Sequence, residues 1–466
     1  MDVSRSTVNI AVAQIVSKVA GLVGTVLFAR ILGPEKLGTY FIFQASLGIL
    51  TIFTDFGISG ALVKRLSEED SSEAVFGTAV VLVTGLVLAT SVIVSTVLNW
   101  SDIQPYSKFT NVLVVGLFLR EYRILLINSL RGELRVSVTA PLEALQKIAW
   151  LILGFLFVTL ESEAISLVYA LLAGNGLVIL ISVFLSDAPI RRPTKTAAIS
   201  LIDYAKYNIV GFVEGHLRQW TDTLLIGAIV GQSAVGAYEI AWRIASSVMI
   251  FPAAIQISVL PQISSWDTKD EKQLIEDLIP QSLFGSFALV IPSFFGVVLL
   301  SGEIITQLFG DSYLAASVPL IILMFGKIIS AVEMVLKSLL SGLDKPDLRA
   351  KAVVIGLVLN ILLNVVFISA FGILGAAVAT TLSVSLTAGI TWWLSQPLIN
   401  LRFPRTEFVY SVIASTVMLL ILFILTEYIP MDTWYGVAMM IFVGAIIYIT
   451  VILLPQKTRR AVLWYT

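Results

Sequence analysis

The sequence contains no cysteine and only one histidine. These absences exclude a disulfide framework, a thiol nucleophile and a zinc site built from cysteine and histidine. Charged residues are scarce as well, at 13% of the 466 residues, compared with about 25% in soluble domains. The 30 basic and 31 acidic side chains nearly cancel, so the basic excess of a nucleic-acid-binding domain is missing. No Walker A motif (GxxxxGK followed by Ser or Thr) occurs, which argues against direct use of ATP.

Long apolar runs fill most of the chain. Hydrophobic residues make up 57% of the sequence, and the mean hydropathy is +0.94. Since about 20 apolar residues span a membrane as a helix, the sequence predicts an all-α polytopic membrane protein with about fourteen transmembrane helices. The predicted spans lie at about residues 7–32, 39–63, 74–98, 109–130, 138–159, 164–187, 202–230, 235–260, 276–308, 317–341, 350–370, 373–396, 408–427 and 434–455.

The breaks between the runs predict the orientation of the chain. Most of their basic residues, among them Lys64 and Arg191, fall on one side, and the other side carries only Arg30, Lys36 and Lys108. Because cytoplasmic loops are enriched in Lys and Arg, both termini are predicted in the cytoplasm. The longest external break, near residues 99–108, is too short for an extramembrane active site, and no catalytic His/Asp group is evident within the spans. The chain is therefore not expected to be an enzyme.

An internal repeat divides the sequence into two halves. ILGPEKLGTY at 31–40 is echoed by IVGQSAVGAY at 229–238, where each copy is predicted to form a tight external turn that needs glycine. Six spans per half give two lobes in parallel repeat about an axis along the membrane normal. The predicted domains are an N-terminal lobe at 1–190, a cytoplasmic linker at 191–200, a C-terminal lobe at 201–400, and two additional spans with a cytoplasmic tail at 401–466.

Several stretches, in this order and spacing, resemble the polysaccharide-transporter (O-antigen flippase-like) branch of the multidrug/oligosaccharidyl-lipid/polysaccharide exporter superfamily. They are ARILGPEKLGTY, TDFGISGALVKR, DTLLIGAIVGQSAVGAYEIAWRI, VLPQIS, SGLDKPDLRAK and LNILLNVVFISAFGILGAAVATT. The resemblance implies a flippase that moves an isoprenoid-linked oligosaccharide from the inner to the outer leaflet by alternating access. The chain also resembles the sibling lipid II flippases, in which the last two of fourteen spans form a groove for the lipid tail. The first span of that sibling carries two arginines, whereas this sequence has Lys18 and Gly24, which argues against lipid II as the substrate.

Charges within the predicted spans mark candidate functional residues, because ionisable groups are costly in a membrane. Guanidinium groups present paired donors to phosphate oxygens, so a cationic cavity for a phosphate or diphosphate headgroup is predicted. Its candidate residues are Lys18, Arg120, Arg123, Arg218 and Arg243. For Arg123, snorkelling toward the membrane surface is an equal alternative.

Four acid–base pairs offer a second interpretation of the intramembrane charges. Their members stand four residues apart, on one helical face, so they either neutralise each other or line the cavity. The pairs are Glu143–Lys147, Glu214–Arg218, Glu239–Arg243 and Glu333–Lys337. Four further charges have no local partner at that spacing and are expected to need a partner or a ligand elsewhere, namely Lys18, Asp55, Asp222 and Lys327.

Oxygen-bearing side chains on three spans suggest an ion site. Hard cations prefer oxygen ligands, and the pattern resembles a sodium site of the lipid II flippases. Its candidate residues are Asp222, Asn360, Asn364 and Thr380. The asparagines could instead hydrogen-bond neighbouring helices. Proton coupling through His216 is the alternative, against which a simple hydrogen-bonded histidine is the commoner explanation.

The expected partners follow from the resemblance. They are a lipid-linked oligosaccharide, membrane lipids and the glycan polymerase or glycosyltransferase machinery, with no nucleic acid and no cofactor, and the chain is expected to be a monomer. A cation-coupled multidrug exporter of the same superfamily and a non-transporting membrane scaffold are the alternatives. An acid in the first span is expected in many drug exporters, whereas this first span contains Lys18 and no acid, which favours an anionic ligand.

Overall fold

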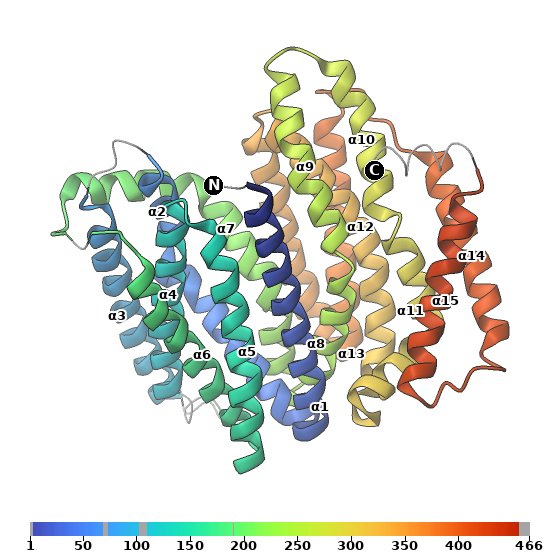
Figure 1. Cartoon of the computed structure of the whole chain (residues 1–466), viewed down its shortest axis with the longest axis horizontal. Helices are drawn as coiled ribbons and strands as arrows, with labels where there is room; N and C mark the ends of the chain where they lie inside the picture. The colour runs from blue at the N-terminus through green and yellow to red at the C-terminus, as the bar shows by residue number, and fades with distance from the viewer. Residues whose placement is uncertain (1–2, 69–72, 102–109, 190, 456–466) are drawn as a thin grey trace. The chain divides into compact units, whose positions relative to one another are not determined.

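All regular elements in the described part of the chain are helices (Figure 1). The computed structural model describes residues 3–68, 73–101, 110–189 and 191–455. They divide into two compact units, Met1–Leu224 and Leu225–Thr466. The division falls inside α7, and residues 195–200 of the predicted linker are the start of that helix. The predicted domain boundaries at 190, 200 and 400 stay a prediction.

The first unit is built from seven helical elements, the last of which continues beyond it. They are α1 Val3–Asp55, α2 Ile58–Leu66, α3 Val75–Ser101, α4 Thr110–Gly132, α5 Val136–Leu160, α6 Ala164–Leu185 and α7 Lys195–Ile229. Long helices form here because the runs are apolar; the chain turns through positive φ at Gly33, before Pro34, and at Gly57, while Pro141 is accommodated within α5. Helix α4 packs against α6, α2, α3 and α1, which places it inside this unit.

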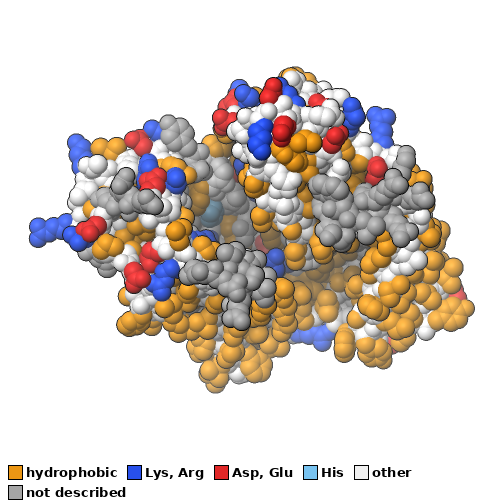
Figure 2. Space-filling view, turned by 45° about the horizontal axis from the view of Figure 1, so that its top comes forward, with side chains coloured by type: hydrophobic (Ala, Val, Ile, Leu, Met, Phe, Trp, Pro, Cys, Tyr) orange, Lys and Arg blue, Asp and Glu red, His pale blue; other side chains and the backbone are white. Residues whose placement is uncertain are grey.

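The second unit contains the remaining helices. They are α8 Gln232–Ser247, α9 Ile250–Asp267, α10 Lys272–Phe287, α11 Val290–Phe309, the short 3-10 helix η2 Asp311–Ala316, α12 Ser317–Gly342, α13 Pro346–Ser395, α14 Arg405–Leu425 and α15 Trp434–Ile452. Helix α12 packs against α13, α9, α11 and α8, and its residues Leu336, Leu339 and Leu340 are fully buried. Figure 2 shows that charged side chains gather at the end of this unit that carries the α9–α10 connection, and that hydrophobic side chains cover much of its flank.

Glycine breaks the two longest helices. Helix α1 has 53 residues and turns at Gly33 (φ 72°), and α13 has 50 residues and turns at Gly372 (φ 59°). Such a length exceeds the roughly 20 residues of one span, so each helix can hold two of the predicted runs. Gly231, at the start of α8, has φ 121°. The predicted need for glycine in both copies of the repeat is therefore confirmed, because side chains other than hydrogen disfavour positive φ.

The polytopic all-α fold is confirmed. Among the described residues, nine helical stretches are long and apolar enough to cross a membrane, and the bent pair α8–α9 would make a tenth. Helices α4 and α7 are not among these stretches, because charged residues interrupt their apolar sequences. The same two helices carry three of the five predicted substrate-binding cations, namely Arg120, Arg123 and Arg218. The count of fourteen spans stays a prediction.

Candidate functional site

The predicted site residues are divided between the two units. The first unit contains Lys18, Arg120, Arg123, Arg218 and Asp222, and the second contains Arg243, Asn360, Asn364 and Thr380. Both sets stay predictions, and the structure describes the surroundings of each residue within its own unit.

Arg120 and Arg123 are the least compensated cations of the first unit. They stand three residues apart on α4 and therefore share one face of the helix. The Nε atom of each guanidinium is buried and has no hydrogen-bond partner. No carboxylate in the described part of the chain lies within ion-pair distance of either residue. Because a buried cation without a counterion is costly, an anionic ligand would stabilise this pair. The buried Nε of Arg123 favours this interpretation over snorkelling.

Arg218 and Arg243 already have counterions on their own helices. Arg218 lies 3.6 Å from Glu214 on α7, and Arg243 lies 3.4 Å from Glu239 on α8. The predicted pairing is confirmed for both arginines. Since each positive charge is balanced locally, these two residues have less need of an anionic ligand than Arg120 and Arg123.

A third predicted pair is confirmed, and the acid of the fourth has a further partner. Glu333 and Lys337 lie 2.9 Å apart on α12. The Oε1 atom of Glu143 lies 2.8 Å from the guanidinium of Arg131, so this carboxylate has a partner outside its own helix, and its pairing with Lys147 stays a prediction. The turn between α4 and α5 brings Arg131 over the start of α5, and the ammonium of Lys147 lies 5.9 Å from the Trp150 ring centroid. Helical spacing alone did not predict the partner across the turn, Arg131.

Of the two positions that carry arginine on the first span of the lipid II flippases, one is basic here (Lys18) and the other is Gly24. The structure shows how each residue is placed. Lys18 is exposed on α1. Gly24 is buried against α5, where an added Cβ would lie 2.5 Å from a ring atom of Trp150. The Trp150 ring in turn stacks on Tyr40, with centroids 5.8 Å apart. A long basic side chain at position 24 would displace this aromatic packing.

The carboxylate of Asp55 binds backbone N–H groups, which helical spacing did not predict. The chain turns through positive φ at Phe56 and Gly57 before α2 begins. The carboxylate of Asp55 accepts hydrogen bonds from the backbone N–H of Gly57 (3.0 Å) and of Ser59 (3.0 Å). It therefore stabilises backbone N–H groups that have no acceptor within the helix, and the positive dipole, at the start of α2. The expectation that Asp55 needs a partner is confirmed, and that partner is backbone.

The predicted ion ligands lie in both units, so the proposed sodium site stays a prediction. Asp222 is buried, with 5% exposure, on α7. On α13, Asn364 is fully buried and Asn360 donates a hydrogen bond of 3.1 Å to Ser383 Oγ. The bond of Asn360 matches the alternative in which the asparagines tie helical segments together. Among the described residues, no group of three or more His, Asp or Glu could hold a metal ion.

His216 and Lys327 both lie against aromatic rings. The Nδ1 atom of His216 lies 2.9 Å from the carbonyl oxygen of Phe212, and since a carbonyl only accepts, Nδ1 carries the hydrogen. This matches the hydrogen-bonded alternative for the histidine. The ammonium of Lys327 lies 5.2 Å from the ring centroid of Trp242, a cation–π contact between α12 and α8.

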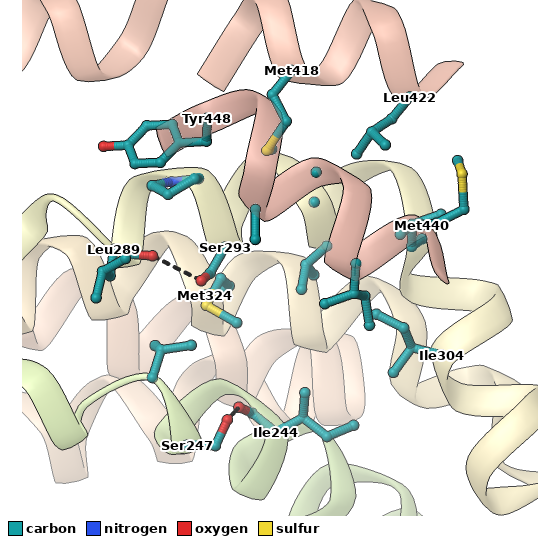
Figure 3. Close-up of a pocket in the computed structure, with 18 of the residues that line it drawn as sticks. Ile244, Ser247, Leu289, Ser293, Ile304, Met324, Met418, Leu422, Met440 and Tyr448 are labelled. Carbon is teal, nitrogen blue, oxygen red and sulfur yellow. Dashed lines mark hydrogen bonds between the residues drawn. The ribbon is translucent and has the colours of Figure 1, made fainter. Parts of the chain in front are cut away.

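An apolar cavity of about 380 Å³ lies among α8, α11, α12, α14 and α15 (Figure 3). The lining includes Met324, Met418, Leu422 and Met440. Methionine side chains are flexible and adapt to varied apolar ligands. The resemblance to the lipid II flippases implied a tail groove formed by the last two helices, whereas the lining of this cavity also includes side chains of α8, α9, α11 and α12.

Tyr448 fixes one wall of this cavity. Pro292 has no N–H to donate to the carbonyl of Ala288, four residues earlier. The hydroxyl of Tyr448 on α15 donates to that carbonyl at 2.5 Å. The proline at the break between α10 and α11 therefore creates an acceptor that anchors α15.

Comparisons with known proteins cover nearly the whole chain. Residues 27–318 match the family described as polysaccharide biosynthesis protein. The chain is 36% identical over 462 residues to the probable low-salt glycan biosynthesis flippase Agl15 of Haloferax volcanii, covering 99% of this chain and 98% of the relative. It is 29% identical over 448 residues to the probable flippase AglR of the same organism, covering 94% and 93%.

A solved structure shares the fold. The lipid II flippase MurJ in an inward closed conformation superposes with a TM-score of 0.80 at 17% identity, covering 95% of this chain and 97% of that chain. At this identity the likeness concerns the fold alone.

Proposed function

Because the chain belongs to the polysaccharide biosynthesis protein family, in the polysaccharide-transporter branch of the multidrug/oligosaccharidyl-lipid/polysaccharide exporter superfamily, we propose that it is a flippase for a lipid-linked oligosaccharide. The names of two relatives, a glycan biosynthesis flippase and a flippase, support this proposal. The family and the fold indicate a transporter rather than an enzyme.

The observation that carries the proposal is the buried arginine pair on α4. The guanidinium groups of Arg120 and Arg123 lack carboxylate partners in the described part of the chain. An isoprenoid phosphate or diphosphate offers the missing charge and accepts several hydrogen bonds at once. Lys18, Arg218 and Arg243 are proposed to assist. An organic cation, the substrate class of a drug exporter, would be repelled by the pair.

The polar and apolar parts of such a substrate need different surroundings. A glycan and its phosphate cannot cross hydrocarbon without polar partners, so the arginines would accompany the phosphate during alternating access. The isoprenoid tail needs only apolar contacts, which the cavity among α11, α14 and α15 offers. An ion or the membrane potential would drive net movement, with Asp222, Asn360, Asn364 and Thr380 as the proposed sodium ligands.

The proposed setting is a prokaryotic cytoplasmic membrane with both termini in the cytoplasm. There the protein would act as a monomer between the glycosyltransferases that build the glycan and the enzymes that use it outside. It is a multi-pass membrane protein.

The proposal is tested by the sidedness of lipid-linked oligosaccharides in cells that lack the protein. A membrane-impermeant glycan probe is applied to intact and to opened cells, in a background that also lacks related flippases. We expect the glycan lipid to accumulate on the inner face and to return to the outer face when the wild-type gene is restored. Unchanged display on the outer face would contradict the flippase and leave the drug-exporter or scaffold alternatives.

The tail cavity gives a separate prediction at Gly296. This glycine lines the cavity, and an added Cβ would meet nothing within 4 Å, so a larger side chain at 296 occupies the space without distorting α11. In Gly296→Phe, a tail must displace the ring, at a cost of about 1–3 kcal/mol for overpacking. Flipping of a long-chain substrate in proteoliposomes is expected to fall about five- to 150-fold.

Gly302→Phe is the matched control. Gly302 lies on the same helix, and an added Cβ there also meets nothing within 4 Å, but Gly302 does not line the cavity. This variant and a short-tailed substrate should show nearly wild-type rates. If Gly296→Phe behaves like Gly302→Phe with the long-chain substrate, the tail does not use this cavity.

A further inference from the structure

Glu121 is a buried acidic group that the transport proposal does not use. It lies on α4 between Arg120 and Arg123, with 1% of its surface exposed. Its Oε2 atom is buried and has no hydrogen-bond partner. In the described part of the chain no Lys, Arg or His lies within ion-pair distance of Glu121. Burial in such surroundings costs much more free energy for an ionised carboxylate than for the neutral acid.

The contact between Glu121 and α1 shows where a proton would sit. The Oγ1 atom of Thr51 lies 2.7 Å from Glu121 Oε1 and 2.9 Å from the carbonyl oxygen of Leu47. A hydroxyl has one hydrogen to donate, and a backbone carbonyl can only accept. Both contacts are hydrogen bonds at once only if Thr51 donates to Leu47 and Glu121 donates to Thr51. That arrangement requires a hydrogen on Oε1, and the distance of 2.7 Å is normal for an O–H···O bond.

The same geometry also accommodates the ionised acid. When Glu121 loses its proton, the Thr51 hydroxyl can turn its hydrogen from Leu47 to Oε1, because the Leu47 carbonyl also belongs to the hydrogen bonds of its helix. Apart from the proton itself, the two states differ only by a rotation of the Thr51 hydroxyl. The proton comes from water and returns to water, and the only bond that changes is the O–H bond of the carboxyl group.

The charged neighbours of Glu121 determine how its proton responds to a ligand. Helices α3 and α6, which pack against α4, contain no acidic or basic side chain. The ionisable groups near Glu121 and its arginines are Asp55 on α1, Arg120, Arg123 and Arg131 on α4, Glu143 on α5, and His216 on α7. Glu143 is itself paired with Arg131. Helix α2, which also packs against α4, carries Lys64 and Arg65, and both lie within ion-pair distance of Glu68. An ionised Glu121 lowers the net positive charge of the arginine pair, whereas a protonated Glu121 leaves that charge available to an anion.

We propose that Glu121 is a proton-binding site, and that binding of an anion at Arg120 and Arg123 is coupled to protonation of Glu121. The coupling rests on the proposed anion site at Arg120 and Arg123, whereas the proton site at Glu121 does not. By linkage, the anion and the proton favour each other's binding to the same degree. Each bound substrate would then carry about one additional proton.

Infrared spectroscopy tests the proton site without a ligand. The wild-type protein in detergent is expected to show the carbonyl band of a protonated carboxylic acid at about pH 7, where an ordinary glutamate with pKa of about 4.3 is ionised. This band should be missing in Glu121→Gln and retained in Glu163→Gln, since Glu163 is exposed and paired with Lys36. A wild-type spectrum without the band, or a band unchanged in Glu121→Gln, would overturn the proposal.

Calorimetry tests the coupling, with farnesyl diphosphate as the probe and buffers of different ionisation enthalpy. We expect wild-type protein to take up a proton on binding near the pH at which Glu121 titrates, and Glu121→Gln to bind with no uptake. Uptake that persists in Glu121→Gln and disappears in His216→Gln would assign the proton to the histidine and overturn the inference. Absence of farnesyl diphosphate binding, with the infrared band retained, would count against the anion site and the coupling while the proton site stands.

Discussion

Replacing Arg120 and Arg123 together by glutamine is expected to lower the rate of flipping at least about a hundredfold. Each hydrogen bond to a charged group contributes about 1.5–3 kcal/mol, so loss of one such bond per arginine removes roughly 3–6 kcal/mol. Each 1.4 kcal/mol of lost binding free energy corresponds to a factor of about ten in affinity, and we expect the flipping rate to fall by the same factor. Each single variant should therefore lose about tenfold or more. The measurement is the transfer of a fluorescent lipid-linked oligosaccharide across proteoliposomes.

Arg131→Gln is the matched control for these variants. Arg131 lies on the same helix, and its guanidinium is paired with Glu143 at 2.8 Å. It is 40% exposed, and such pairs contribute about 0–1 kcal/mol. The control should therefore fold and transport within a few-fold of wild type. If the double variant matches this control while its melting temperature is unchanged, the arginine pair does not bind the substrate.

Removing one member of the Glu333–Lys337 pair is expected to have the largest effect on stability. The two side chains lie 2.9 Å apart, and they are 3% and 10% exposed. Glu333→Ala leaves the Lys337 ammonium buried without this counterion, which typically costs about 3–5 kcal/mol. Thermal unfolding in detergent should show a loss of several degrees or failure to fold.

The double variant Glu333→Leu/Lys337→Met separates a structural role from a transport role. Replacing both members of a buried ion pair by apolar residues of similar size is often neutral or stabilising. We therefore expect the double variant to recover most of the lost melting temperature and to flip substrate at nearly the wild-type rate. A stable double variant without transport would show instead that these charges line the substrate path.

Local features of the chain were predictable because they depend on few neighbouring residues. An apolar run predicts a helix in a membrane whatever surrounds it. The four-residue spacing of Glu214–Arg218 and Glu333–Lys337 fixes those ion pairs on one helical face. The repeat predicted glycine at both Gly33 and Gly231, where positive φ is observed.

Contacts between distant residues were not predictable from spacing. The packing of α4 on α1 brings Glu121 to Thr51, 70 positions earlier, and no spacing along the chain predicts this contact. The turn after α4 brings Arg131 to Glu143 on α5, a partner that helical spacing did not predict. In both cases the partner depends on which helical faces meet.

The sequence by itself determined that this protein is an all-helical, multi-pass member of a polysaccharide-transporter family, because hydropathy, helical period and family motifs are written along the chain. The tertiary structure alone decided which charges are compensated. It gave Asp55 the start of α2 as its partner, left Arg120 and Arg123 without carboxylates among the described residues, and buried Glu121 beside a threonine. The physical reason is that the free energy of a buried charge depends on the atoms packed around it, and helix packing brings those atoms together from distant parts of the sequence.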